Sequence, residues 1–240
     1  MASALLVACA VMACNGDKQR ASPARDSMVT EARSTRAVAA PVVPSARTDE
    51  KRTVLFLGTS LTAGLGLDPD SAYPQQIQRK IDARGLPYQA VNAGVSGETS
   101  AGLLRRLDWV LQNSAAVIVV ETGANDGLRG QAVTATKATI GQILTRIKRE
   151  RPDANVLLVQ MEAPTNLGTE YTKAFHGMFP DLAQQFDVGL IPFLLDGVAG
   201  ISELNQADGI HPNLAGERKV AENVWKALEP VLRRPGGPLP

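Results

Sequence analysis

The chain has 240 residues, 44% of them hydrophobic, which is enough to bury one substantial core. Its 25 Lys and Arg residues nearly balance its 24 Asp and Glu residues, and it contains no basic stripe with interleaved aromatic residues. This composition argues against nucleic acid as a partner and predicts one globular domain with tails.

The N-terminal segment has the pattern of an export signal. Residues 4–13 are apolar, too short to span a bilayer and of the length of a signal-peptide core. The sequence Val11-Met12-Ala13-Cys14 resembles a bacterial lipoprotein cleavage box, whose cysteine is lipidated, and Cys9 fits the same pattern after a shorter apolar core. We therefore expect residues 1–14 to be a leader, and the protein to be exported as a periplasmic protein or a lipoprotein tethered to the membrane through Cys14. The alternative is a leader without function.

The next segment is rich in Ala, Arg, Ser, Thr and Pro and has no sustained apolar period. Because it cannot bury enough surface to offset chain entropy, residues 15–50 are predicted to be a disordered linker. A folded domain is predicted over residues 51–235, followed by a short tail at 236–240. This domain contains no cysteine, so the sequence predicts neither disulfides nor thiol chemistry in it.

From residue 53 the pattern alternates between strands and helices. Apolar runs predict buried strands at 53–57, 88–92, 116–120, 156–159 and 188–191. Apolar stripes of helical period predict helices around 74–84, 103–111, 140–147, 175–186 and 220–231. Strands separated by helices pair in parallel through right-handed crossovers. The predicted fold class is therefore α/β, a three-layer α/β/α sandwich resembling flavodoxin with about five parallel strands.

Polar groups fall where the predicted strands end, at the sheet edge where α/β proteins bind ligands. Ser60 follows the first strand, Asn92-Ala93-Gly94 ends the second, and residues 123–126 (Gly-Ala-Asn-Asp) follow the third. Residues 208–211 (Asp-Gly-Ile-His) precede the last helix, which Pro212 and Asn213 are expected to open. A hydroxyl, an imidazole, a carboxylate and an amide can therefore meet at one site.

These blocks, in this order, resemble the SGNH (GDSL-type) hydrolases from the first strand to the last helix. The chain is most similar to the branch of periplasmic multifunctional thioesterase, lysophospholipase and arylesterase proteins. The segments that carry this similarity are residues 64–67 (Gly-Leu-Gly-Leu), 72–74 (Ala-Tyr-Pro), 92–99 (Asn-Ala-Gly-Val-Ser-Gly-Glu-Thr) and 123–130 (Gly-Ala-Asn-Asp-Gly-Leu-Arg-Gly).

The resemblance implies a serine hydrolase that forms an acyl-enzyme on Ser60. His211 would take the proton of the Ser60 hydroxyl, and Asp208 would hold the imidazole in the required tautomer. The backbone N–H groups of Ser60 and Gly94 and the side-chain amide of Asn125 would form the oxyanion hole. The resemblance implies no cofactor. The chain also lacks a His/Cys/Asp cluster at ligand spacing, which argues against a metal hydrolase.

One residue departs from the family pattern. Thr59 stands where the family's Gly-Asp-Ser-Leu block has aspartate. Because this aspartate is not a triad member, we expect altered hydrogen bonding in the loop and retained chemistry. Asp126 and Arg129 are expected to order the loop that carries Asn125, and His176 lies off its helix's apolar stripe and is expected at the surface.

Three functions remain open from the sequence. The first is hydrolysis of small acyl esters and thioesters, with arylesterase, acyl thioesterase or lysophospholipase-like activity. The second is an O-acetylesterase acting on envelope polysaccharide. The third is a non-catalytic binding protein of the same fold, suggested only by Thr59. Residues 161–171 are predicted to form a mobile loop near the site with little apolar surface, which favours short-to-medium acyl chains.

Overall fold

The computed structural model describes residues 51–234. The predicted leader (1–14), linker (15–50) and tail (236–240) lie outside the described residues. The described part contains a five-stranded parallel sheet in the order β2-β1-β3-β4-β5. The strands are β1 (Arg52–Gly58), β2 (Tyr88–Gly94), β3 (Val117–Val120), β4 (Asn155–Val159) and β5 (Gly189–Ile191).

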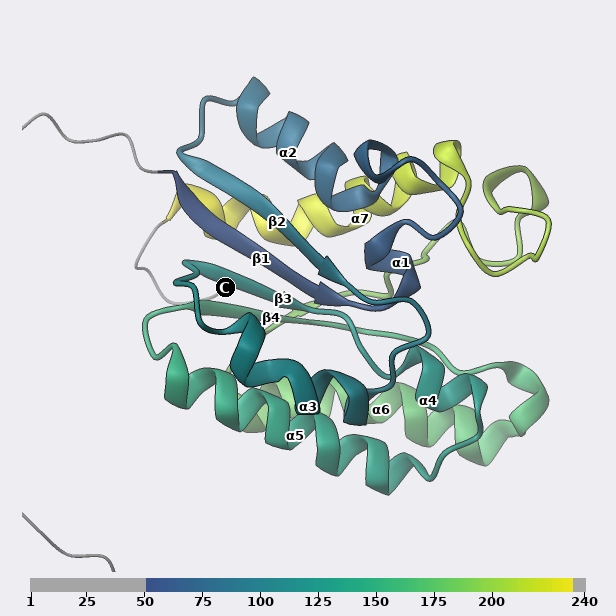
Figure 1. The fold of residues 1–240 in the computed structure, drawn as a ribbon. Coiled ribbons are helices and arrows are strands. Elements are labelled where there is room, and N and C mark those ends of the chain that lie inside the picture. Colours follow the sequence, from purple (N-terminus) through teal and green to yellow (C-terminus); the bar gives the residue numbers. More distant parts are fainter. Residues whose placement is uncertain (1–50, 235–240) are drawn as a thin grey trace, which may run out of the picture. The chain divides into compact units, whose positions relative to one another are not determined.

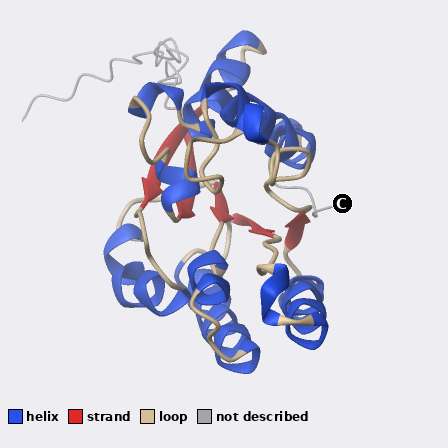
Figure 2. Cartoon of the chain, turned by 90° about the vertical axis from the view of Figure 1, so that its right-hand side faces the viewer, coloured by secondary structure: helices blue, strands red, loops and turns tan. Residues whose placement is uncertain are grey.

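Helices cover both faces of the sheet, so the predicted three-layer α/β/α sandwich is confirmed (Figures 1 and 2). One layer consists of α2 (Tyr73–Ala83) and α7 (Leu214–Arg233), which pack against each other. The other consists of α3 (Ser100–Val110), α5 (Val133–Glu150) and α6 (Thr169–Phe186). Within residues 51–234, no helix is both long and apolar enough to cross a membrane.

The core lies along the central strands. Residues 54–57 of β1 and all of β3 are buried, as expected for parallel strands that helices cover on both faces. Phe56 of β1 meets Tyr73 of α2 edge-to-face, with ring centroids 5.7 Å apart. The edge strand β2 is only partly buried. The strands that precede Ser60 and residues 123–126, β1 and β3, are therefore the most deeply buried.

The structure adds short elements that the sequence reading missed. Helix α1 (Ser60–Ala63) begins two residues after β1, and α4 (Ala124–Leu128) follows β3 closely. Both are too short to show an apolar period, so pattern reading cannot detect them. Three 3-10 turns occupy Pro69–Ser71, Thr165–Leu167 and Ser202–Leu204.

The segment after β4 differs from its prediction. Residues 161–171 were expected to form one mobile loop, but α6 already begins at Thr169. Met161 and Ala163 are buried in the core cluster, where apolar contacts hold them. The predicted loop is therefore shorter than expected and partly packed against the core, while its mobility stays a prediction.

The strand order places the polar blocks at one point. In the order β2-β1-β3-β4-β5, the connections after the neighbouring strands β1 and β3 leave in opposite directions, so a crevice opens beyond the carboxyl ends of these two strands. Helix α1 begins there after β1, and α4 begins there after β3 (Figure 1).

Candidate active site

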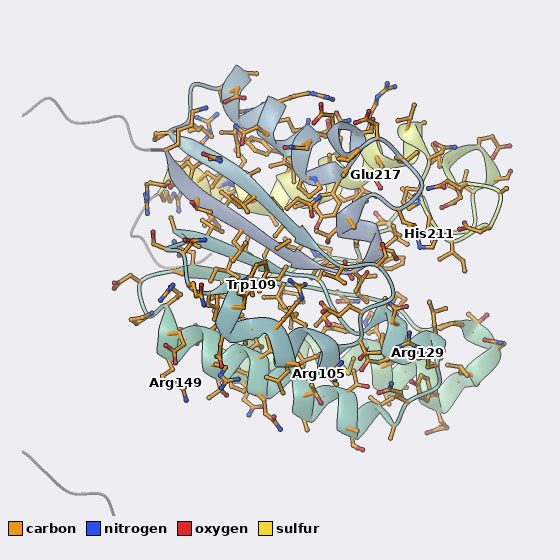
Figure 3. The ribbon with its side chains drawn as sticks, in the orientation of Figure 1. Arg105, Trp109, Arg129, Arg149, His211 and Glu217 are labelled. Carbon is orange, nitrogen blue, oxygen red and sulfur yellow. The ribbon has the colours of Figure 1, made fainter. Side chains whose placement is uncertain are left out.

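Ser60, His211 and Asp208 form a continuous hydrogen-bonded chain. His211 Nε2 lies 2.9 Å from Ser60 Oγ, and His211 Nδ1 lies 2.6 Å from Asp208 Oδ2. A neutral imidazole with its proton on Nδ1 donates to Asp208 and accepts the Ser60 hydroxyl proton at Nε2, the arrangement of a general base. Residues 151 positions apart are thus brought together at the carboxyl edge of the sheet. Figure 3 shows where His211 lies.

The turn that carries the imidazole is built by Asp208. Its Oδ1 accepts the N–H groups of Ile210 at 2.9 Å and of His211 at 3.0 Å. Hydrogen bonds from the backbone and then the side chain of His211, followed by the Ile210 N–H, hold the pKa of Asp208 well below its usual range. Asp208 therefore stays ionised opposite the imidazole across the neutral pH range.

The same loop is anchored to the start of α7. Asn213 is the N-cap of this helix: its Oδ1 accepts the N–H groups of Ala215 and Gly216, and its Nδ2 donates to the carbonyls of Glu203 and Asn205. The helix thus begins at Leu214, one residue later than Asn213, which was expected to open it. A capped helix start fixes the backbone two residues beyond His211.

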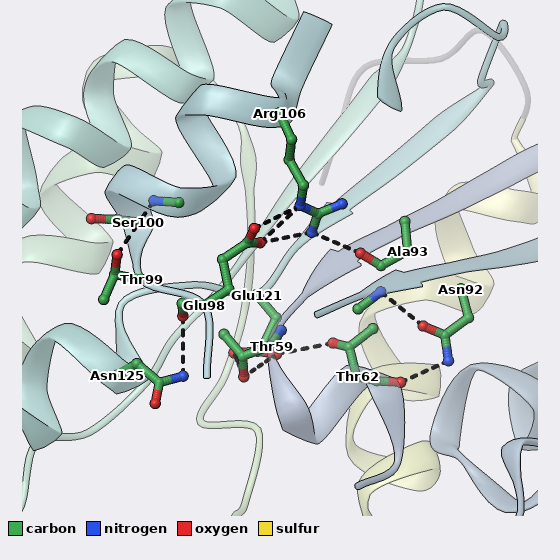
Figure 4. Close-up of polar contacts among 12 residues, drawn as sticks. Thr59, Thr62, Asn92, Ala93, Glu98, Thr99, Ser100, Arg106, Glu121 and Asn125 are labelled. Atoms are coloured by element: carbon green, nitrogen blue, oxygen red, sulfur yellow. Dashed lines mark hydrogen bonds and ion pairs between the residues drawn. The ribbon is translucent and has the colours of Figure 1, made fainter. Parts of the chain in front are cut away.

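Asn125 lies in the first turn of α4 and faces the same cavity as Ser60 and His211. One N–H of its side-chain amide donates to the carbonyl of Glu98 at 3.0 Å, which leaves the second N–H for a ligand. Arg106 in turn holds Glu98 through contacts of 2.7 to 3.0 Å and donates to the Ala93 carbonyl at 2.8 Å (Figure 4). The orientation of the Asn125 amide is therefore set by hydrogen bonds that connect it, through Glu98 and Arg106, to β2.

The structure contradicts the assignment of Gly94 to the oxyanion hole. The N–H of Gly94 donates to Asn92 Oδ1 at 2.9 Å, and Gly94 does not line the cavity that contains Ser60. A Cβ at this position would lie 2.4 Å from the backbone nitrogen of Ala63. This glycine is therefore required for the close approach of β2 to α1, and its N–H is already paired.

A neighbouring glycine of the same block occupies the site instead. Gly97 lines the cavity together with Ser60 and Asn125. Its φ of 76° lies in the left-handed region that favours glycine. Nothing among residues 51–234 accepts a hydrogen bond from its N–H, while its carbonyl accepts Arg129 Nη2 at 3.0 Å. The block contains both glycines, and only their three-dimensional placement distinguishes them.

The loops around Asn125 are ordered as predicted. Asp126 is buried and accepts hydrogen bonds from the backbone N–H and the hydroxyl of Ser100 at 2.8 and 2.6 Å, which ties α4 to the start of α3. Arg129 holds Gly97 through the bond described above. The predicted roles of Asp126 and Arg129 are confirmed.

The cavity in front of Ser60 has a volume of about 460 Å³. Its walls are largely apolar, with side chains from the loops after β1, β3, β4 and β5. They include Leu61, Leu65, Leu128, Met161, Phe193, Leu195 and Ile210. Such a lining suits the hydrocarbon part of an ester, and its few polar side chains include the hydroxyl, imidazole and amide already described.

Among residues 51–234, Glu162 is the one acidic residue that lines this cavity. Its Oε1 lies 2.7 Å from His176 Nδ1 and accepts a hydrogen bond from Gln160 Nε2 at 2.8 Å. His176 is at the surface as predicted, with 57% of its side chain exposed, but its pairing with Glu162 was not foreseen. No sequence signal connects residues 14 positions apart on a loop and a helix.

No metal-binding cluster accompanies the site. Across residues 51–234, no three His, Cys, Asp or Glu side chains gather in an arrangement that would hold a metal ion.

Comparison with known proteins gives one consistent family. Residues 56–219 match the sequence profile of the GDSL-like Lipase/Acylhydrolase family. The chain is 40% identical over 182 residues to esterase TesA of Pseudomonas aeruginosa, which covers 75% of this chain and 90% of that protein. It is 38% identical over 181 residues to thioesterase 1/protease 1/lysophospholipase L1 of Escherichia coli, covering 75% and 85% of the two chains.

Solved structures agree with this result. The crystal structure of TesA covers 75% of this chain and 99% of its own, with a TM-score of 0.71 and 39% identity. The psychrotrophic esterase EstA from Pseudoalteromonas sp., solved with monoethylphosphonate as inhibitor, covers 76% of this chain and all of its own, with a TM-score of 0.72 and 32% identity.

Proposed function

The chain belongs to the GDSL-like lipase/acylhydrolase family, and from this premise we propose that it hydrolyses carboxylic esters and thioesters through an acyl-enzyme on Ser60. The relatives named esterase and thioesterase support this reaction class. The observation that carries the proposal is the hydrogen-bonded chain from Ser60 Oγ through His211 to Asp208, which opens into an apolar cavity.

Acylation follows from the geometry of these three residues. As Ser60 Oγ attacks the acyl carbon, His211 Nε2 takes the hydroxyl proton, and the ionised Asp208 stabilises the imidazolium that forms. When the tetrahedral intermediate collapses, the bond to the leaving group breaks and the imidazolium gives that oxygen or sulfur its proton. In deacylation, His211 takes a proton from a water molecule that attacks the acyl carbon. The bond to Ser60 Oγ then breaks, Ser60 regains its proton from the imidazolium, and the acid is released.

The oxyanion is stabilised by neutral donors. We assign this role to the backbone N–H groups of Ser60 and Gly97 and to the second amide N–H of Asn125. Ser60 is the first residue of α1, so its N–H has no partner within that helix. Neutral donors suit a charge that develops only in the transition state, because they need no counter-charge in the resting site.

The cavity suggests which acyl groups are preferred. Each methylene of the acyl chain that is fully buried against the apolar walls stabilises the bound state by about 0.8 kcal/mol. We therefore expect kcat/KM to rise over the first few carbons of the acyl chain and to level off once the chain extends beyond the protein. None of the roles assigned above depends on whether the leaving atom is oxygen or sulfur, so a thioester should compete with an ester of the same acyl length. The same walls offer few partners to sugar hydroxyls, which weighs against an O-acetylesterase acting on polysaccharide.

The test is covalent labelling combined with burst kinetics. A p-nitrophenyl butyrate burst equal to the enzyme concentration, and labelling by a phosphonate at Ser60, are expected for the wild type. Ser60→Ala should lower kcat by about 10⁴-fold or more and abolish both signals. Ser202→Ala, which changes an exposed serine of a 3-10 turn, is the matched control. Turnover near the wild-type rate in Ser60→Ala contradicts the proposal.

The location of the enzyme is a separate proposal that rests on the sequence. We propose export and anchoring through a lipid on Cys14. Fractionation of cells should place the wild type with membranes and Cys14→Ser in the soluble fraction, with the esterase activity of the two forms unchanged. Equal distribution of the two forms contradicts the anchor.

A further inference from the structure

Glu121 is a buried carboxyl group that contacts Thr59 and Thr62, the residues on either side of Ser60 in the turn that carries it. It follows the last residue of β3, and its side chain has no exposed surface. Its Oε2 accepts the N–H of Thr59 at 2.7 Å and the hydroxyl of Thr62 at 2.9 Å, and both oxygens lie 3.0 Å from the Thr59 hydroxyl (Figure 4). A single carboxyl group thus holds the residue before Ser60, Thr59, and the residue two positions after it, Thr62.

These contacts change how α1 begins. Thr59 is the N-cap residue of α1, a position where a threonine hydroxyl ordinarily accepts an N–H of its own helix. Here the hydroxyl makes no such bond and donates to Glu121. The end of β3 therefore fixes the turn that carries Ser60, in place of the helix's own cap.

The surrounding packing leaves the carboxylate little freedom. The hydroxyl of Thr62 also contacts the Tyr73 hydroxyl at 2.9 Å, and the N–H of Glu121 donates to the Leu57 carbonyl at 2.8 Å. A Cβ on Gly58 would lie 2.7 Å from Glu121 Oε2 and even closer to Thr62, so only glycine admits this arrangement. Thr62, Tyr73 and Glu121 have no exposed surface, and Thr59 is 2% exposed at the wall of the cavity.

Building on the proposed function, we propose that Glu121 is a positioning residue for the reaction: through Thr59 and Thr62 it holds the hydroxyl and N–H of Ser60 in their working geometry. Burial raises the pKa of Glu121, and the hydrogen bonds from Thr59 and Thr62 oppose that rise. The Thr59 N–H can only donate to this carboxyl group, while the two threonine hydroxyls can donate or accept, so the contacts hold the group in either protonation state.

The role predicts a specific kinetic pattern. In Glu121→Gln the amide presents a donor to at least one of the two threonine hydroxyls, and Thr59→Val removes a hydroxyl at nearly constant shape. Each is expected to lower kcat about 10- to 100-fold, with KM changed less than about threefold, because misplacement of the nucleophile acts on the chemical step. Thr59→Ser restores the hydroxyl and should recover most of kcat. The double variant Glu121→Gln with Thr59→Val should be little worse than either single variant.

Glu217→Gln is the matched control. Glu217 is also buried, with 1% of its surface exposed, and it accepts the N–H of Tyr73 at 2.7 Å, but it contacts none of the residues assigned to the reaction. It lies on α7, on the same side of the sheet as α2 (Figure 3). Its variant measures what changing a buried carboxyl group does to the fold, and kcat per folded molecule should stay at the wild-type value.

The outcomes separate the two proposals. All variants are assayed in the full-length protein with p-nitrophenyl butyrate, with active sites counted by burst amplitude and folding checked by thermal unfolding. Wild-type turnover without a burst argues against the acyl-enzyme itself. If the wild type shows the burst but Glu121→Gln keeps the wild-type kcat, only the role of Glu121 is overturned. The same conclusion holds if Glu121→Gln and Glu217→Gln lose kcat equally. If Glu121→Gln does not fold, full kcat in Thr59→Val overturns it as well.

Discussion

Asp208 contacts His211 through both of its carboxylate oxygens, one on the ring and one on the backbone. Oδ2 lies 2.6 Å from Nδ1, and Oδ1 accepts the His211 N–H at 3.0 Å. The second bond fixes the turn, so the ring is aligned before substrate arrives. A single side chain thereby sets both the orientation and the tautomer of the base.

Asp208→Asn separates these two tasks. The amide oxygen can still accept the backbone N–H groups, but its NH₂ group favours the wrong imidazole tautomer. We expect kcat to fall about 10⁴-fold with little change in thermal stability. Burst kinetics on p-nitrophenyl butyrate provide the measurement, and Asp196→Asn, at an exposed position, is the control. A loss below tenfold would mean that another group orients His211.

Asn125→Ala tests the oxyanion hole. Removal of one preorganised donor should lower kcat about 10²- to 10³-fold with a small change in KM, because the lost bond forms only in the transition state. The control is Asn166→Ala, at an exposed position of the 3-10 turn Thr165–Leu167. A change confined to KM would place Asn125 in substrate binding instead.

Gly94→Ala and Gly97→Ala should have opposite signatures. A Cβ at Gly94 meets the backbone of Ala63 at 2.4 Å, so this change should destabilise the fold by roughly 1 to 3 kcal/mol. A Cβ at Gly97 meets nothing within 4 Å, but alanine is strained at the left-handed φ of 76°, so the substitution should displace the N–H that we assign to the oxyanion hole. Gly97→Ala should therefore act mainly on kcat. Urea unfolding and steady-state kinetics on both variants decide between these roles, and a kcat loss confined to Gly94→Ala would reverse the assignment.

Buried carboxyl groups should make the fold less stable as the pH rises. Burial raises the pKa of Glu217 to about 8, against a partly compensating bond from the Tyr73 N–H. The folded state holds the Glu217 proton more tightly than the unfolded state does. The protonated Glu217 therefore makes its full contribution to the free energy of unfolding below the unfolded pKa of 4.5, and this contribution is lost as the pH rises to about 8. The free energy of unfolding should fall by up to about 1.4 kcal/mol per pH unit in that window. Glu217→Gln should flatten the urea-unfolding profile between pH 5 and pH 8, and an unchanged slope contradicts the assignment.

Glu162 should bias the cavity toward substrates that carry positive charge. It is the one acidic residue of the lining, about a third of its side chain is exposed, and no Lys or Arg of the described chain lines the same cavity. Butyrylthiocholine should be hydrolysed about three- to tenfold faster, by kcat/KM, than its uncharged isostere S-(3,3-dimethylbutyl) thiobutyrate. Glu162→Gln should bring this ratio close to one, and Glu170→Gln, at an exposed position on α6, should leave it unchanged. A ratio near one in the wild type would show that the carboxylate does not reach the substrate.

The sequence by itself was sufficient for the fold class and the triad. Apolar runs report burial directly, so the five strands and the long helices could be located from residues such as Val54–Leu57 and the stripe of α7. Ser60, Asp208 and His211 stood in loops at one predicted sheet edge, and the resemblance of these loops to the SGNH (GDSL-type) blocks implied their roles. Their separation of 151 positions was no obstacle, since parallel topology brings strand ends together.

Only the tertiary structure decided which backbone and buried groups serve the site. Gly94 and Gly97 are equivalent in a sequence, and they differ only in whether the N–H is already bonded and in what a Cβ would meet. Glu121 reads as the end of an apolar strand, and its partners Thr59 and Thr62 lie 62 and 59 positions away. Hydrogen-bond satisfaction and steric fit depend on positions in space, so a pattern of residue types cannot supply them.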